Sequence, residues 1–220
     1  MVQGEKRKIT YPVRRLLLLC AGLCIMAFGI AFSIKAALGT SPISSVPYVA
    51  AVISRLSVGT TTILINSIFI LLQILILRKR YDWFQLLQFP AVILFGLMID
   101  LAEYIISPIV FSGYMEQWML CAVGILLLAF GVSLEVMANL ILTPGEGLVI
   151  TFCKVLPIKF GNMKVIFDTS LALLSVLLSL IFLGHLDGVR EGTIISALLV
   201  GQIAKQVGKW MKKVETAWLT

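Results

Sequence analysis

Residues 35–45 read KAALGTSPISS and residues 137–147 read MANLILTPGEG, and these two stretches decide the fold. Each lies between long apolar segments, and each places a proline, Pro42 or Pro144, directly after a hydroxyl residue. Serine and threonine favour the N-cap of a helix, and proline is well tolerated at the first helical position. Each stretch therefore predicts that one helix ends and that a short new helix begins.

The two stretches are parts of an internal repeat. Shifting the sequence by 102 residues aligns small, turn-forming and polar residues as well as apolar ones: Gly22 with Gly124, Ala27 with Ala129, Gly29 with Gly131, Pro42 with Pro144, Gly59 with Gly161, and Asn66 with Asp168. A further shift of three residues aligns Gly96 with Gly201. Chance similarity between apolar segments seldom keeps such residues in register, so the pattern indicates a repeat.

The composition is that of an integral membrane protein. Of the 220 residues, 60% are hydrophobic and 13% are charged, and the mean hydropathy is +1.03. Soluble domains average about 45–50% apolar and about 25% charged residues. The net charge of +7 comes from short basic blocks at the ends of apolar runs. Such blocks indicate membrane topology rather than nucleic-acid binding.

Six stretches are apolar and long enough, or nearly so, to cross a bilayer as helices, which takes about 20 residues. They are Leu16–Ala37, Thr60–Leu77, Phe84–Ile106, Gln117–Ala138, Val165–Leu183 and Thr193–Val207. We call the two points where one helix is expected to end and a short one to begin, before Pro42 and before Pro144, the first and second break. The stretches that follow the breaks, residues 41–56 and 144–156, are shorter and each contains a basic residue. We expect them to form helices that re-enter the membrane or lie at its surface.

The distribution of lysine and arginine supports this count of six spans. With six spans and a cytoplasmic N-terminus, 15 of the 18 basic residues lie on the cytoplasmic side of the membrane. The three on the outer side are Lys35, Arg55 and Arg190. If the two short helices also crossed, the cluster at residues 78–80 would face outward, contrary to the positive-inside rule. We therefore expect a multi-pass protein of the cytoplasmic membrane with both termini in the cytoplasm. The first span follows basic residues as a signal peptide does, but it recurs within the chain and is expected to remain in the mature protein.

The expected fold is all-α, a transmembrane bundle of six spans in two inverted three-helix repeats, each with one short re-entrant or interfacial helix. The repeats are inverted because an odd number of spans makes the second copy enter the membrane from the opposite side. The expected organisation is a basic N-terminal segment (1–15), a first repeat (16–107), a second repeat (117–207) and a cytoplasmic tail (208–220). Inverted repeats with interrupted helices occur in secondary transporters, where the interruptions form the binding site near the membrane midplane.

Three motifs carry a family resemblance: KAALGTSPISS at residues 35–45, LTPGEG at residues 142–147 and KFG at residues 159–161. With these motifs the chain resembles the YczE/YitT-like family of bacterial integral membrane proteins, from about residue 16 to residue 207. It resembles the short YczE-type branch, because we expect the chain to lack the soluble C-terminal domain of YitT-type members. The resemblance implies a multi-spanning membrane protein and supplies no reaction.

Polar residues at the breaks and within the spans are the candidate site, because such side chains are costly inside a membrane and usually face a cavity or a partner. For solute binding we expect the residues at the two helix starts and two aligned residues within spans: Thr40, Ser41, Ser44, Ser45, Asn66, Thr143, Gly145, Glu146 and Asp168. For ion coupling we expect Glu135, Asp168 and Asp100. The alternatives are that the breaks merely turn the chain and that Asn66 and Asp168 form hydrogen bonds between helices.

The expected function is that of a secondary transporter or permease for a small polar solute. Two helix N-termini directed at one place favour an anionic group, whereas an ionised Glu146 at that place favours a cation or a zwitterion, and the sequence leaves both open. The alternative function is a non-transporting accessory or substrate-capture subunit of a larger complex. The expected partners are therefore the lipid bilayer and a small solute. The sequence also allows a homo-oligomer or a membrane partner protein.

The sequence offers no residue set for catalysis or for metal binding. Cys20 and Cys24 are one turn apart in an apolar segment, and the only histidine, His185, lies in a polar loop. These residues form neither the ligand pattern of a zinc site nor a nucleophile with its base. We therefore expect no enzyme activity, no cofactor, no metal ion and no nucleic-acid partner.

Overall fold

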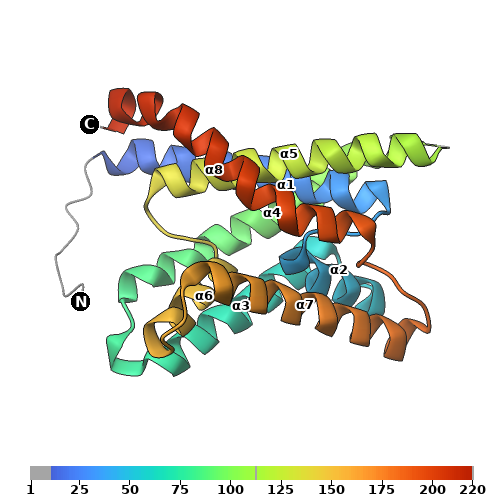
Figure 1. Ribbon diagram of the computed structural model, residues 1–220, viewed down its shortest axis with the longest axis horizontal. Helices are drawn as coiled ribbons and strands as arrows, with labels where there is room; N and C mark the ends of the chain where they lie inside the picture. The colour runs from blue at the N-terminus through green and yellow to red at the C-terminus, as the bar shows by residue number, and fades with distance from the viewer. Residues whose placement is uncertain (1–10, 112, 220) are drawn as a thin grey trace.

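The computed structural model describes residues 11–111 and 113–219, with side chains described up to Met211. These residues contain helices and no β-strand, as expected for an all-α protein. The helices (Figure 1) are α1 (Pro12–Ala36), α2 (Pro42–Ser54), α3 (Val58–Leu77), η1 (Arg78–Arg80), η2 (Trp83–Leu87), α4 (Gln88–Ile106), α5 (Tyr114–Ala138), α6 (Pro144–Val155), α7 (Phe160–Leu183) and α8 (Glu191–Leu219). Residues 1–10 of the expected basic segment, and the side chains of residues 212–220 in the expected tail, lie outside the described part.

Five helices are long and apolar enough to cross a membrane. They are α1, α5 and α7, together with α3 and α4 extended by the adjoining 3-10 turns to Val58–Arg80 and Trp83–Ile106. α8 is not among them, since Gln202, Lys205 and Gln206 interrupt its apolar stretch. The structure therefore has the character of a helical membrane bundle, and a sixth span on α8 stays a prediction.

The two short helices cannot cross a bilayer alone. α2 has 13 residues and α6 has 12. At about 1.5 Å of rise per residue, each is roughly 20 Å long or shorter, whereas the hydrocarbon core of a bilayer is about 30 Å thick. Both therefore match the expected short helices that follow the breaks.

The helix boundaries recur along the chain at the alignment found in the sequence. α1 and α5 are each followed by a residue in the left-handed conformation, Ala37 with φ 54° and Asn139 with φ 45°. Such a residue ends a helix. α2 and α6 then begin at the aligned prolines, Pro42 and Pro144, and α3 and α7 also begin at aligned positions.

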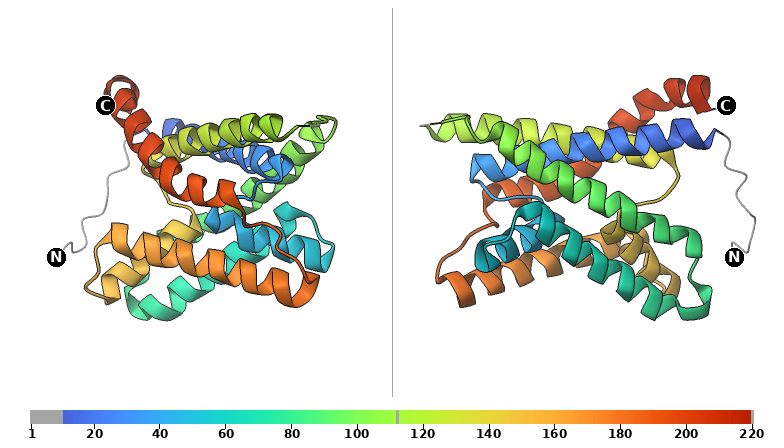
Figure 2. Two further views of the ribbon diagram at one scale, coloured as in Figure 1. Left: turned by 45° about the vertical axis from the view of Figure 1, so that its right-hand side comes forward. Right: turned by 180° about the vertical axis from the view of Figure 1, so that it is seen from behind.

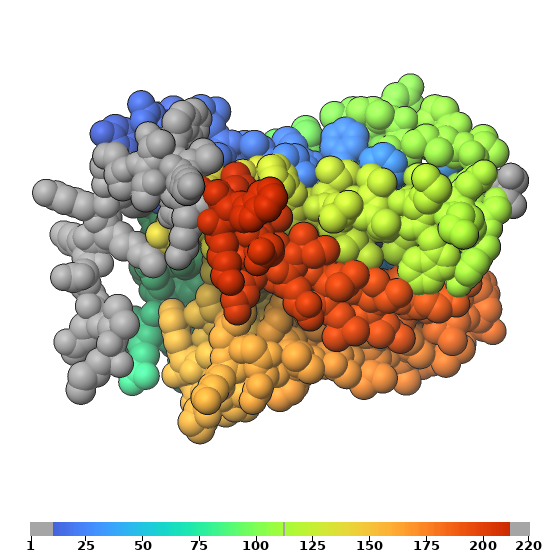
Figure 3. Space-filling model, turned by 45° about the horizontal axis from the view of Figure 1, so that its top comes forward, coloured from blue at the N-terminus to red at the C-terminus, as the bar shows by residue number. Residues whose placement is uncertain are grey.

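The helices form two layers joined by two diagonal helices. α1 and α5 run side by side in opposite directions in one layer, and α2, α3, α6 and α7 form the other (Figures 1 and 2). α4 packs on α1 and α3, and α8 packs on α5. Figure 3 shows α8, in red, lying across the face of α5. The short helices α2 and α6 both contact α3 and α7 within the second layer.

Aligned glycines bring α1 and α5 into close contact. A Cβ atom added at Gly22 would lie 2.9 Å from the backbone oxygen of Gly131, and one added at Gly29 would lie 2.9 Å from the backbone oxygen of Gly124. Because backbone atoms cannot move aside as side chains do, only glycine fits at these points. Four glycines of the repeat therefore act in helix–helix packing.

The two halves differ where α4 and α8 are placed. A Cβ atom added at Gly59 on α3 would lie 2.6 Å from the carboxyl group of Asp100 on α4, and one added at Gly96 on α4 would lie 2.6 Å from the backbone oxygen of Gly59. At the aligned positions Gly161 and Gly201, no described atom lies within 4 Å of an added Cβ. The contact between α3 and α4 is thus closed, whereas the corresponding contact between α7 and α8 is open.

Candidate functional site

α2 and α6 begin next to each other in the protein interior. A Cβ atom added at Gly145 would overlap the side chain of Ile43, so the first turns of the two helices are in direct contact. Pro42 and Pro144 are buried, whereas the far ends of α2 and α6 are exposed. The N-terminus of a helix carries a partial positive charge, and two such ends meet here.

Glu135, near the end of α5, connects α5 to the start of α6. Its oxygen Oε1 accepts a hydrogen bond from the backbone N–H of Thr143, the residue before α6. The residue is only 1% exposed, and its other oxygen, Oε2, has no hydrogen-bond partner in the described part of the chain. A buried polar atom without a partner is uncommon in proteins, because it loses its hydration without compensation.

A small cavity adjoins Glu135. It offers about 10 Å³ to the centre of a water molecule, which is room for about one. Hydrocarbon side chains from α1, α4 and residues 141–144 form most of its lining, and the polar side chains come from Gln88, Glu135 and Thr143. The cavity therefore presents a carboxyl group to an otherwise mostly apolar space.

Two buried glutamines complete the surroundings of the α6 start. Gln73 Nε2 donates hydrogen bonds to Gln88 Oε1 at 3.2 Å and to the backbone oxygen of Pro144 at 3.1 Å. A Cβ atom added at Gly147 would lie within 3 Å of both amide groups, so α6 packs directly against them. The sequence reasoning missed Gln73 and Gln88, although a glutamine within an apolar stretch is a usable signal of a buried polar contact.

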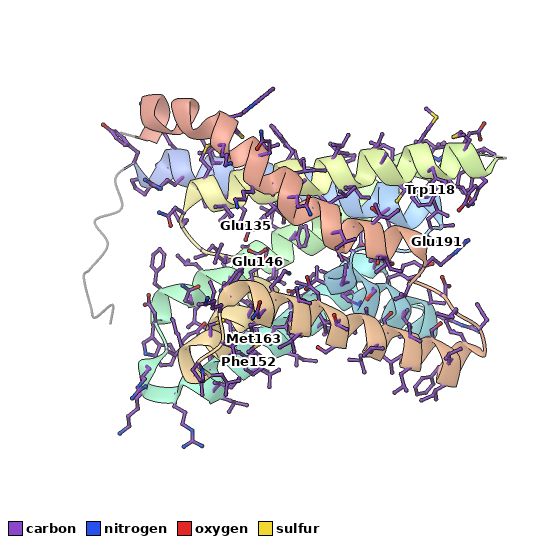
Figure 4. The ribbon with its side chains drawn as sticks, in the orientation of Figure 1. Trp118, Glu135, Glu146, Phe152, Met163 and Glu191 are labelled. Carbon is purple, nitrogen blue, oxygen red and sulfur yellow. The ribbon has the colours of Figure 1, made fainter. Side chains whose placement is uncertain are left out.

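A second carboxyl group, Glu146, lies in the first turn of α6. Figure 4 shows Glu135 and Glu146 close together between the two helix layers. The two carboxyl groups interact electrostatically, and Glu146 also interacts with Lys164 and Asp168 on α7. Lys164 and Asp168, four residues apart on α7, form an ion pair of 3.0 Å with partly buried side chains. The α6 start is therefore acidic, with one lysine nearby.

The start of α2 is lined by hydroxyl groups that bond to one another. Ser41 Oγ donates to Ser44 Oγ at 3.0 Å, and Ser45 Oγ donates to the backbone oxygen of Pro42 at 2.7 Å. All three serines are buried. Ser41 and Thr143 occupy the N-cap positions of their helices, but neither side chain makes a capping hydrogen bond. The α2 start thus differs chemically from the acidic α6 start.

The loop between α7 and α8 covers the first break, a role that its polar sequence alone did not reveal. The backbone N–H of Thr40 donates to the backbone oxygen of Gly188 at 3.1 Å, and Arg190 Nη1 donates to the backbone oxygen of Ala37 at 2.9 Å. A second small cavity of about 20 Å³ lies between this loop and the break. The first break is therefore held by contacts from the other half of the chain.

Most of the residues expected at the site lie around the two adjoining helix starts: Thr40, Ser41, Ser44, Ser45, Glu135, Thr143, Gly145 and Glu146, with Asp168 on the neighbouring α7. Asn66 donates to the backbone oxygen of Thr62, one turn back in α3, at 2.9 Å. Asp100 accepts hydrogen bonds of 2.7 Å from Ser57 Oγ and from the backbone N–H of Gly59, at the start of α3. Of the expected site residues, Thr40, Glu135 and Thr143 line one or other of the two cavities.

The described part of the chain contains no group of three or more His, Cys, Asp or Glu side chains placed to hold a metal ion.

The comparison with protein families gives one match: the model of DUF6198, described as a family of unknown function, matches residues 13–209. No curated protein and no solved structure matches the chain.

Proposed function

The chain belongs to the DUF6198 family, whose function is unknown, and we propose that it is a secondary transporter for a small polar solute. The proposal places the protein in the cytoplasmic membrane with both termini in the cytoplasm. It treats α8 as the sixth span and the two halves as inverted repeats, and it keeps the resemblance to the YczE/YitT-like family. The solute site is the region where the starts of α2 and α6 meet.

The observation that carries the proposal is the direct contact between these two helix starts. Ile43 and Gly145 are aligned positions of the repeat, and they touch each other in the interior. Two proline-initiated helices that begin side by side inside a membrane protein, and end at its surface, have the arrangement of re-entrant helices in transporters built from inverted repeats.

The charges at the site favour a solute with a cationic or hydrogen-bond-donating group. Glu135 and Glu146 lie close together beside the α6 start, and the cation Lys164 acts on both carboxyl groups. Opposite charges in a medium of low dielectric attract strongly, so an amine or another cation is favoured over an anion. This resolves, within the proposal, the conflict between the positive helix ends and the acidic side chain of Glu146.

The difference between the two halves supports a transport cycle. Alternating access needs one half to adopt, in turn, the arrangement that the other half has now. The α3–α4 contact at Gly59 and Gly96 is closed, whereas Gly161 and Gly201 on α7 and α8 are open. In the proposed cycle, α8 moves towards α7 while α4 separates from α3.

The test is uptake by purified protein in proteoliposomes that contain no other protein. The solutes are labelled amino acids, primary amines, quaternary ammonium ions and small carboxylates, each with and without a proton or sodium gradient. We expect uptake of an amine-bearing class, reduced tenfold or more by Glu146→Gln and unchanged by Glu191→Gln, which alters an exposed carboxyl at the start of α8. Equal uptake by Glu146→Gln and the wild type would reject this site.

Lack of uptake in every class would reject autonomous transport and favour the accessory-subunit alternative. Insertion and folding are checked for each variant by size-exclusion chromatography in detergent, so that loss of uptake is not confused with loss of the protein.

A further inference from the structure

We propose that Glu135 carries a proton on its oxygen Oε2 and that this proton is the coupling ion of the transporter. We infer the protonation of Glu135 from the geometry of the described residues. Its use in coupling rests on the proposed function above.

The hydrogen bonding of Glu135 distinguishes its two oxygens. Oε1 accepts the backbone N–H of Thr143, as either a carboxylate or a carbonyl oxygen does. Oε2 faces no donor in the described residues, although the residue is fully buried. An ionised carboxylate would have at most one water molecule in the adjoining cavity as a donor to this oxygen, and such a poorly compensated buried charge is strongly unfavourable. A protonated carboxyl group with its hydrogen on Oε2 removes the charge.

The cavity beside Glu135 fits a proton better than a metal cation. A hard cation is held by several oxygen ligands, but the lining from α1 and α4 is mostly hydrocarbon, including Leu19, Leu23 and Phe95. The polar side chains at the cavity are those of Glu135, Gln88 and Thr143, and Gln88 Oε1 already accepts from Gln73. One water molecule fits in the cavity and can receive the hydrogen bond of the carboxyl O–H.

The charged groups around Glu135 include a candidate acceptor for its proton. Glu146 on α6 is an acidic group that acts on it electrostatically, and Lys164 on α7 acts on both carboxyl groups. Asp168 on α7 is engaged by Lys164, and Arg15 on α1 donates to the backbone oxygen of Ala138 at 3.0 Å. Glu146 is therefore the acceptor expected for the proton of Glu135.

The proposed step is a proton transfer between the two carboxyl groups. The O–H bond at Glu135 Oε2 breaks and an O–H bond forms at the Glu146 carboxylate, so that the negative charge moves from Glu146 to Glu135. A cationic solute that binds beside Glu135 compensates the new charge there. Release of the proton from Glu146 to the solvent then exchanges one proton for one positive charge on the solute.

The test is infrared spectroscopy of the purified, solute-free protein in lipid nanodiscs at neutral pH. We expect a C=O stretching band of a protonated carboxyl group that shifts in D2O. Glu135→Gln should lower the intensity of this band, and Glu191→Gln should leave it unchanged. Glu135→Asp keeps a carboxyl group and should shift the contribution of residue 135 to the band, so it serves if the glutamine variant does not fold.

The inference is overturned if the wild type lacks such a band, or if the band is the same in a folded Glu135 variant as in the wild type. Because no solute is present, this measurement does not depend on the uptake experiments. A protonated Glu135 in a protein that transports none of the solutes would reject the proposed function while leaving the proton site intact.

Discussion

Enlarging Gly145 tests whether the two helix starts meet. A Cβ atom at this position would overlap Cδ1 of Ile43 and would lie 3.1 Å from its Cγ1. Ile43 packs against the apolar cluster formed by Val46, Leu148 and Phe167, among others, so it cannot swing freely into empty space. The variant Gly145→Ala therefore forces either a side-chain rearrangement or a small separation of α2 from α6.

The magnitude follows from the size of this overlap. Adding one methyl group to a filled site typically lowers the free energy of unfolding by about 1–3 kcal/mol. Replacing glycine by alanine within a helix raises it by up to about 1 kcal/mol. We expect a net loss of about 1–2 kcal/mol in the free energy of unfolding. Ile43→Val removes Cδ1, the overlapping atom, and by itself costs about 0.5–1.5 kcal/mol.

The decisive measurement is the stability of the double variant Ile43→Val, Gly145→Ala. If Ile43 and Gly145 touch, Ile43→Val makes room for the new methyl group, and the double variant should be more stable than the sum of the single effects by about 1 kcal/mol. Thermal unfolding in detergent measures this, since each kcal/mol corresponds to roughly 2–4 °C for a chain of this size. Gly201→Ala is the control, because no described atom lies within 4 Å of the added Cβ, and it should not lower stability. Strictly additive effects would refute the contact.

Three further predictions concern the scaffold. Gly131→Ala should lower the free energy of unfolding by about 1–3 kcal/mol, because its Cβ would lie 2.7 Å from the backbone oxygen of Gly22; thermal unfolding equal to that of the wild type would contradict the close α1–α5 contact. Asp100→Asn should lower it by about 1–2 kcal/mol, because a charged acceptor of the Gly59 N–H at the start of α3 is lost, and urea unfolding measures the loss. Ser179→Ala should speed hydrogen exchange in the loop between α7 and α8, because its Oγ both donates to and accepts from that loop; unchanged exchange there would show that the loop is held by its other contacts.

Much of the fold was predictable because its determinants are local. Pro42 and Pro144 begin helices by fixing the backbone of their own residues, and the residues before them already end the preceding helices within a few positions. The apolar length of a span is likewise a property of a single segment. The α8 segment is the exception: the sequence predicts a span at Thr193–Val207, but Gln202 and Lys205 make α8 less apolar than the five helices that are long and apolar enough to cross a membrane.

The candidate site was only partly predictable. Glu135 stood out as an acidic residue in an apolar segment, and Glu146 stood out by its place at a helix start. Asp100 stood out for the same reason as Glu135. In the structure, however, Asp100 on α4 directs its carboxylate to the N-terminus of α3, where the free N–H groups favour a negative charge. Gln73 and Gln88 were missed, because an uncharged amide inside a span gives no sign of whether it faces lipid, a helix or a cavity.

The sequence by itself determined that the chain forms long apolar helices and where they are interrupted. Inside a bilayer each segment must satisfy its backbone hydrogen bonds on its own, so helix formation and helix ends depend on neighbouring residues. Only the tertiary structure decided that Ile43 touches Gly145 and that one oxygen of Glu135 is left without a partner. Both facts depend on how segments separated by many residues are placed against one another, and side-chain packing between distant segments sets that placement.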